Sequence, residues 1–156
     1  MKAVANTYTQ IYLHIVFAVS GRACCISENH REELQKYITG IATSLEQKLI
    51  AIYCMPDHTH ILLGYHPSKP LPEVVGKIKT GSTNLINEQR WLGCRFRWQE
   101  GYGAFSVSQS DLGRVITYIR NQPERHRQRT FQEEYIAFLE RYAVDFDQKY
   151  IFKPND

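Results

Sequence analysis

Apolar and β-branched residues cluster in three short runs in the first half of the chain, and each run has the length of a strand. Residues 11–19 read IYLHIVFAV, which is typical of a buried strand. Residues 49–54 and 58–65 flank a three-residue connection of hairpin length, in which Pro56 ends pairing. The pattern therefore predicts one buried strand and, later in the chain, a β-hairpin.

Elsewhere the apolar positions recur every three or four residues, which is the period of a helix with one buried face. Such stretches are residues 28–47, 73–89 and 131–142. Ser27 is a candidate N-cap for the first of them. A further helix is expected from Ser110, which can cap it, to about Gln122, because Pro123 follows.

Two short strands, residues 96–99 and 104–108, are expected on either side of a glycine-containing turn. The predicted order is then β-α-β-β-α-β-β-α-α. This order indicates an α+β fold, a ferredoxin-like or RRM-like antiparallel sheet with helices packed mainly on one face. At 156 residues the chain has the length of a single domain, in which residues 131–156 form a C-terminal helix and tail.

Composition narrows the class of protein. Hydrophobic residues make up 43% of the chain and charged residues 22%, so it can bury a core and is not a disordered tail. No apolar run approaches the roughly 20 residues of a membrane helix, and the first ten residues lack the basic-then-apolar order of a secretory signal. We therefore expect a cytoplasmic protein whose four cysteines are reduced, because none of them forms a CxxC pair.

Positive charge is concentrated in the middle of the chain. Residues 71–130 contain ten Lys and Arg against five Asp and Glu, and basic residues there alternate with Trp91, Phe96 and Trp98. Positive charge for phosphates and aromatic faces for bases is the usual means of holding single-stranded nucleic acid. Surface lysines combined with core tryptophans would give the same pattern. The candidate DNA-binding residues are Lys77, Lys79, Ser82, Arg90, Arg95 and Arg97.

The sharpest local feature is the Asp-His-Thr-His run that begins at Asp57 and starts the second strand of the hairpin. Side chains alternate across a strand, so His58 and His60 project from one face and Thr59 from the other, apolar face. Neutral imidazole is a common metal ligand, and two neighbours on one face can reach the same ion. Two histidines on a solvated sheet face would produce the same short motif.

The helix expected after Ser110 offers two more polar groups. Tyr118 and Gln122 are four residues apart and share one flank of its apolar stripe, so they share an environment. On periodicity alone, a tyrosine in this position is more often a core residue with a satisfied hydroxyl.

Five blocks extend these local features over nearly the whole chain: MPDHTHILL, KIKTGS, RWQEGYGAFSVS, YIRNQPERHR and FQEEYIAFLERY. In this order and spacing they resemble the small single-tyrosine transposases of bacterial insertion sequences, members of the HUH nuclease superfamily. The resemblance implies that His58 and His60 are the metal-binding pair. It further implies that Tyr118 is the nucleophile and Gln122 the third metal ligand.

The chain departs from the pattern of that family at two positions. Thr59 stands where the family more often has a large apolar residue, but threonine is also β-branched and suits a strand. Arg125 stands where many relatives have a histidine, so neither Arg125 nor His126 is given a role.

The activity implied by the resemblance is cleavage and rejoining of single-stranded DNA at the ends of an insertion sequence. A divalent ion, Mg²⁺ or Mn²⁺, would withdraw charge from the scissile phosphate. Attack by Tyr118 would form a 5′-phosphotyrosine link and leave a 3′ hydroxyl, so no nucleotide cofactor is needed. The implied partners are DNA hairpins near the ends of the element and a second copy of the chain. In such a homodimer Tyr118 would serve either its own histidine pair or that of its neighbour.

Two other functions use the same features. The first is a noncatalytic protein that binds single-stranded DNA hairpins and derives from a transposase; the presence of all four site residues argues against this loss of chemistry. The second is a metal-dependent hydrolase that releases its product to water, which would leave Tyr118 without a role.

Overall fold

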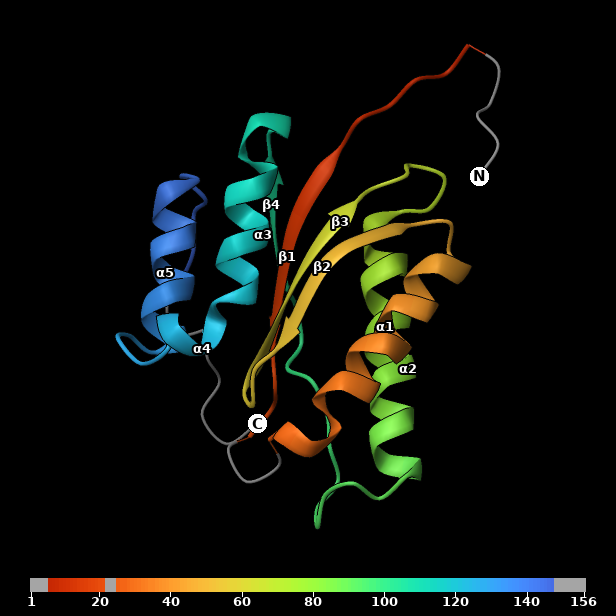
Figure 1. Ribbon diagram of the computed structural model, residues 1–156, viewed down its shortest axis with the longest axis vertical. Coiled ribbons are helices and arrows are strands. Elements are labelled where there is room, and N and C mark those ends of the chain that lie inside the picture. Colours follow the sequence, from red (N-terminus) through yellow and green to blue (C-terminus); the bar gives the residue numbers. More distant parts are fainter. Residues whose placement is uncertain (1–5, 22–24, 148–156) are drawn as a thin grey trace.

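The computed structural model describes residues 6–21 and 25–147, which form a four-stranded antiparallel sheet between two layers of helices (Figure 1). The strands are β1 (Tyr12–Ala18), β2 (Lys48–Cys54), β3 (His58–Gly64) and β4 (Gly103–Val107). They lie in the order β2-β3-β1-β4, so β1 and β3 form the centre of the sheet. The α+β fold with an antiparallel sheet is confirmed.

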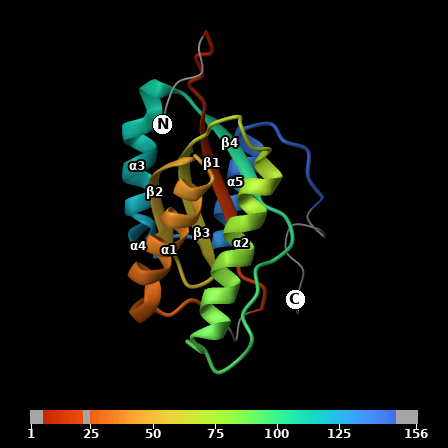
Figure 2. The same cartoon turned by 90° about the vertical axis from the view of Figure 1, so that its right-hand side faces the viewer.

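The first helical layer covers one face of the sheet. It consists of α1 (Arg31–Ser44), which follows a short 3₁₀ turn (Glu28–His30), and α2 (Leu71–Glu88). The two helices pack beside each other on this face (Figures 1 and 2). Alternate strand residues such as Ile15, Phe17 and Ile61 point into this layer and form the main hydrophobic core.

The second layer covers the opposite face and follows β4 in the chain. It consists of α3 (Leu112–Arg120), α4 (Gln122–Arg125) and α5 (Phe131–Arg141), with a 3₁₀ turn (Gln109–Asp111) before α3. The sequence predicted helices mainly on one face of the sheet. This holds for the helices before β4, whereas the helices after β4 cover the opposite face. The other face also carries apolar side chains, including Val16, Leu62 and Phe105, and α3 and α5 bury them.

Local features of the sequence fix where several helices begin. Ser27 caps the 3₁₀ turn before α1, since its hydroxyl accepts a hydrogen bond from the Asn29 amide at 3.2 Å. Thr130 begins α5 in a capping box with Glu133, in which each side chain accepts a hydrogen bond from the backbone amide of the other. Ser110 does not cap α3; it lies inside the preceding 3₁₀ turn.

Two other expectations are wrong in detail. Residues 96–99 do not form a strand: they contribute one isolated bridge, between Val19 and Trp98, because Phe96 and Trp98 turn into the core. Cys94 is disulfide-bonded, so the four cysteines are not all reduced; spacing along the chain does not reveal which thiols meet in space. Cys54 is a buried free thiol. Cys24 and the expected tail after residue 147 lie outside the described residues.

None of the helices in the described residues combines the length and the apolar character needed to cross a membrane.

Candidate active site

The candidate site lies on the central strands, on the face covered by α3, α4 and α5. In the antiparallel register His60 is opposite Val16 and His58 is opposite Ala18, so both histidines project toward the second helical layer. His14 projects from the same face of β1. Thr59 points into the main core, as the alternation predicts. The face that carries the histidines is not solvated, because His58 and His60 are each 0% exposed.

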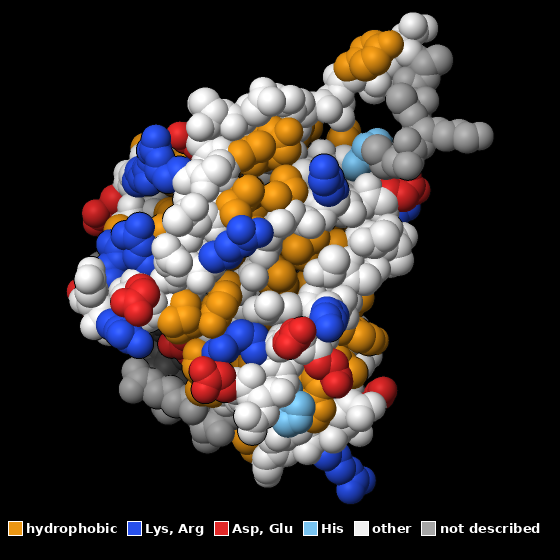
Figure 3. Space-filling view, in the orientation of Figure 1, with side chains coloured by type: hydrophobic (Ala, Val, Ile, Leu, Met, Phe, Trp, Pro, Cys, Tyr) orange, Lys and Arg blue, Asp and Glu red, His pale blue; other side chains and the backbone are white. Residues whose placement is uncertain are grey.

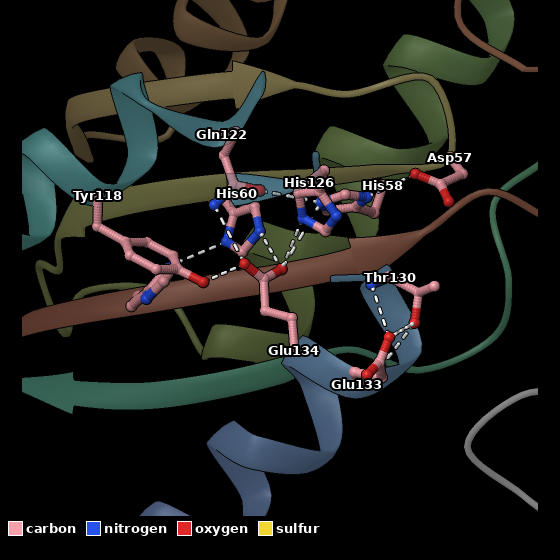
Figure 4. Close-up of polar contacts among 10 residues, drawn as sticks. Asp57, His58, His60, Tyr118, Gln122, His126, Thr130, Glu133 and Glu134 are labelled. Atoms are coloured by element: carbon pink, nitrogen blue, oxygen red, sulfur yellow. Dashed lines mark hydrogen bonds and ion pairs between the residues drawn. The ribbon is translucent and has the colours of Figure 1, made fainter. Parts of the chain in front are cut away.

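Each helix of the second layer contributes one polar side chain to this face. Tyr118 lies near the end of α3, Gln122 begins α4, and Glu134 lies in the first turn of α5. His126 directly follows α4. Figure 4 shows these side chains converging on the histidine pair from different elements.

The carboxylate of Glu134 is at the centre of the site and is 1% exposed. Its Oε1 atom accepts hydrogen bonds from Nε2 of His60 at 3.0 Å and Nε2 of His126 at 3.2 Å, and it lies 3.7 Å from Nε2 of His58. Its Oε2 atom accepts hydrogen bonds from the Tyr118 hydroxyl and, at 3.2 Å, from the Gln122 amide. One carboxylate therefore connects the tyrosine with the histidine pair (Figure 4).

Each histidine of the pair also forms a hydrogen bond through Nδ1, the ring nitrogen that does not face Glu134. Nδ1 of His58 donates to the Asp57 carboxylate at 2.7 Å, and Nδ1 of His60 shares a 2.8 Å hydrogen bond with Nε2 of His14. Nε2 of His58 is 3.2 Å from the Gln122 carbonyl oxygen. A partner on the far nitrogen is the usual way in which a protein fixes the ring of a metal-binding histidine.

Burial and charge set the protonation states in this group. Burial lowers the pKa of His60 to about 4 and that of His14 to about 3, so both rings are neutral near pH 7. Burial alone would raise the pKa of Glu134, but hydrogen bonds from His126 and His60 outweigh it and hold the pKa well below its ordinary value. Burial and the Glu134 charge raise the pKa of Tyr118, so the phenol is protonated.

The donor set fits a divalent cation. His58, His60, His126 and Glu134 each offer a ligand atom, and these atoms lie within 4.8 Å of one another. Metal bonds of about 2.0–2.2 Å keep two ligand atoms within roughly 4.4 Å, so the spacing is close to what one ion needs. Neutral imidazoles together with a carboxylate are suited to a transition metal ion.

The structure brings together all four residues that the sequence assigned to catalysis and metal binding: His58, His60, Tyr118 and Gln122. Sequence reasoning missed Glu134, His126 and His14. Glu134 did leave a signal, because it falls between Phe131 and Phe138 on the buried stripe of α5, where a charged residue needs a partner. His14 left another, as the one imidazole in an otherwise apolar strand.

The six candidate DNA-binding residues lie apart from this site. Lys77, Lys79 and Ser82 lie on α2, which covers the opposite face of the sheet, and Arg90, Arg95 and Arg97 lie on the segment that joins α2 to β4 (Figure 1). Lys77, Arg90, Arg95 and Arg97 are exposed, whereas Lys79 is half-buried and donates hydrogen bonds to the Gln99 and Gly101 carbonyls.

Ser82 cannot contact DNA in this structure. Its side chain is 0% exposed, and its hydroxyl donates to the Ile78 carbonyl and accepts from the Trp98 indole at 2.9 Å. Phe96 and Trp98 are likewise core residues and not stacking platforms for bases. Trp91 is partly buried and stacks on His30.

Comparison with known proteins agrees with this fold. The profile of the IS200-like transposases matches residues 7–122, and the chain belongs to this family of single-tyrosine HUH transposases. Transposases cleave DNA, so the family places the chain among DNA-cleaving enzymes.

Two curated relatives are of similar length. The ISDra2 transposase TnpA of Deinococcus radiodurans is 24% identical over 132 residues, which cover 80% of this chain and 93% of the relative. The transposase of the IS200 element of Salmonella typhimurium is 24% identical over 131 residues, which cover 81% of this chain and 86% of the relative.

Two solved structures share the fold. One is a protein of Deinococcus radiodurans R1 assigned as a transposase, which superposes with a TM-score of 0.60 at 25% identity over 78% of this chain and 98% of that one. The other is a REP-associated tyrosine transposase bound to a REP hairpin, with a TM-score of 0.56 at 16% identity over 81% of this chain and 74% of that one.

Proposed function

We propose that this protein cleaves and rejoins single-stranded DNA at the ends of an insertion sequence, through a covalent bond between Tyr118 and a 5′ phosphate. The observation that carries the proposal is the shared carboxylate: the Tyr118 hydroxyl and the His60 imidazole bind the two oxygens of Glu134. A tyrosine nucleophile and a metal-bound phosphate have to meet within a few ångströms, and this contact supports that proximity.

In this proposal His58, His60 and Gln122 hold a divalent ion, Mg²⁺ or Mn²⁺. Glu134 and His126 are further candidate ligands, because their atoms face the same point. Bound there, the ion would polarise the scissile phosphate and neutralise part of its charge. Asp57 and His14 bind the Nδ1 atoms of His58 and His60, respectively, and so fix the orientation of the two rings.

Tyr118 supplies the nucleophile. Its oxygen forms a bond to phosphorus, the bond from phosphorus to the 3′ oxygen breaks, and the phenolic proton ends on the departing 3′ hydroxyl. The hydroxyl is protonated and bound to Glu134 in the resting state, so it must leave this carboxylate or pass its proton to it before attack. The bond energy is kept in the phosphotyrosine, so rejoining needs no nucleotide cofactor.

The arrangement also bears on the assembly. Tyr118 meets the histidine pair of its own chain, which supports a tyrosine that serves its own subunit in this state. The proposed substrate is a DNA hairpin near the element's end, and the REP hairpin bound by a protein of the same fold supports this class of ligand. The exposed residues Lys77, Arg90, Arg95 and Arg97 remain the proposed hairpin surface. A homodimer remains part of the proposal.

The test is incubation with labelled single-stranded DNA from the ends of the element and Mn²⁺, followed by a denaturing gel. We expect a covalent protein–DNA adduct that Tyr118→Phe abolishes. Tyr37→Phe is the matched control, because Tyr37 is a half-exposed tyrosine on α1 and faces away from the site. Binding without any adduct would favour the noncatalytic protein, and cleavage that survives Tyr118→Phe would favour the hydrolase.

A further inference from the structure

Next to the catalytic group, α3 and α5 enclose a cavity of about 280 Å³ that has Tyr118 in its wall. Four arginines line it: Arg114 of α3, Arg125 of α4, Arg129 of the following loop and Arg141 at the end of α5. We call this the arginine cavity. Figure 3 shows several Lys and Arg side chains, with Asp and Glu side chains between them, on the side of the molecule where α3 and α5 lie.

The two acidic residues that line the arginine cavity do not neutralise all four arginines. Asp111 pairs with Arg114 at 3.3 Å, and Glu134 is occupied by Tyr118 and the histidines. Within residues 6–21 and 25–147, Arg125 and Arg141 form no ion pair with a carboxylate. The cavity therefore has an excess of positive charge that is available to an anion.

The positions of two arginines connect this charge to the nucleophile. The Arg125 guanidinium lies 5.0 Å from the centroid of the Tyr118 ring. Arg129 lines the same cavity as Tyr118, and its guanidinium opposes the rise in the pKa of the Tyr118 hydroxyl. Guanidinium groups bind phosphate oxygens in a bidentate manner, so arginine is well suited to hold a nucleic acid backbone beside a reacting tyrosine.

We propose that the arginine cavity binds the phosphates of the DNA strand on the 3′ side of the scissile bond, the strand that becomes joined to Tyr118. This inference rests on the proposed function, because only a 5′-phosphotyrosine link ties that strand to this residue.

The chemistry of the link selects the strand. Attack by Tyr118 is in line with departure of the 3′ oxygen, so the departing strand leaves on the side of the phosphate opposite the phenol. The 5′ oxygen stays on phosphorus, and the strand that it begins remains tethered at Tyr118, beside the arginine cavity. The half-buried rings of Phe138 and Tyr142, which also line the cavity, offer apolar surface for its bases.

The two basic surfaces would then have different tasks. Lys77 on α2 and Arg90 just after it lie on the side of the sheet that α2 covers, where they can bind a DNA hairpin without approaching Tyr118. The arginine cavity would hold a single strand at the reacting phosphate. Substitutions on the two surfaces should therefore change different properties of DNA binding.

The experiment uses the full chain carrying Tyr118→Phe, so that no covalent reaction occurs. The probes are a short fluorescent oligothymidylate with a 5′ phosphate and the same oligonucleotide with a 3′ phosphate, and binding is followed by anisotropy over a range of salt. We expect tighter binding of the 5′-phosphorylated probe. Adding Arg125→Ala and Arg129→Ala should abolish this preference and reduce the slope of log K against log salt by roughly 1.4, about 0.7 for each lost contact with single-stranded DNA.

Two controls make the result specific. Lys36→Ala on α1 with Lys48→Ala at the start of β2 removes the same charge at exposed positions that do not line the arginine cavity, and it should keep the preference for the 5′ phosphate. Arg125→Lys with Arg129→Lys keeps the charge and should restore most of the salt slope. The proposal is overturned if the alanine pair in the cavity leaves the preference intact, or if it weakens both probes equally.

The adduct assay separates this inference from the proposed function. Adduct formation by the wild-type chain, with no effect of the cavity arginines on the 5′ preference, would refute the strand assignment alone. A 5′ preference that depends on these arginines, in a chain that forms no adduct, would uphold the cavity as a phosphate site and refute the proposed chemistry.

Discussion

The hydroxyl of Tyr118 donates its hydrogen bond to Glu134, a residue of a different helix and 16 positions further along the chain. The same carboxylate accepts hydrogen bonds from His60 and His126. One buried carboxylate of α5 thus connects Tyr118 of α3 with two histidines of the site.

Substitution of Glu134 by glutamine should destabilise the protein. The isosteric amide is neutral, so the hydrogen bonds from the histidines lose their charged acceptor; hydrogen bonds to charged groups contribute about 1.5–3 kcal/mol each. We expect the free energy of unfolding in urea, with a chelator present, to fall by about that amount. Glu140→Gln on the exposed side of α5 is the control, with an expected change within about 0.5 kcal/mol. Equal effects of the two substitutions would show that the Glu134 carboxylate contributes no more to the free energy of unfolding than an exposed carboxylate.

Addition of Mn²⁺ to the chelated protein should raise its melting temperature. A ligand at 100 times its Kd adds about 2.7 kcal/mol of stability, which corresponds to roughly 5–10 °C for a chain of this size. Mg²⁺ should give a smaller shift than Mn²⁺, because imidazole ligands favour transition metals. His60→Ala should remove the shift, and His66→Ala, at a histidine just beyond the other end of β3, should keep it. A shift that survives His60→Ala would place the ion elsewhere.

The metal-free protein should lose stability as the pH falls below 6.5. Burial holds the pKa of His14 at about 3, while the same residue in the unfolded chain titrates at 6.5. Between these values the unfolded chain binds a proton at His14 that the folded protein does not, which makes unfolding easier by about 1.4 kcal/mol for each pH unit lost. His60, with its pKa lowered to about 4, adds a similar contribution over the same range. Urea unfolding between about pH 6.5 and 5, above the range of most carboxylates, measures this slope. His14→Asn should reduce the slope by about one proton, and an unchanged slope would contradict the pKa assignment.

Substitution of Gly103 by alanine should loosen α5. A Cβ atom at this position in β4 would lie 2.8 Å from both Cε1 and the hydroxyl of Tyr135, the neighbour of Glu134. Overpacking of this kind costs about 1–3 kcal/mol, and it should also reduce the shift in melting temperature caused by Mn²⁺. Gly76→Ala is the matched control, because an added Cβ meets nothing within 4 Å there, and alanine in the middle of α2 should stabilise the protein by about 0.5–1 kcal/mol. Equal stability of the Gly103 variant and wild type would mean that α5 adapts to the added carbon.

The parts of the fold that could be predicted are those in which short-range periodicity decides the outcome. Alternation along β3 was sufficient to place His58 and His60 on one face and Thr59 on the other. The four-residue spacing of Tyr118 and Gln122 correctly indicated a shared environment, since both bind Glu134. In these cases neighbours in sequence are neighbours in space.

The sequence-based predictions that failed depend on contacts between segments that are far apart in the chain. Sequence periodicity does not reveal that α5 returns to the sheet and inserts Glu134 beside His60, 74 positions earlier in the chain. For the same reason Trp98 read equally well as a base-stacking residue, until the structure buried its ring and paired its indole with Ser82.

The matched family segment ends at Gln122, yet the carboxylate at the centre of the site comes from a helix beyond that point. Removing everything after residue 122 would preserve all four strands but expose the histidines to water and release the phenol. The first 122 residues carry the proposed nucleophile and metal ligands, and α5 covers them in this structure. Changes confined to the last 34 residues could therefore alter how this group is covered without altering any of the four residues proposed for catalysis and metal binding.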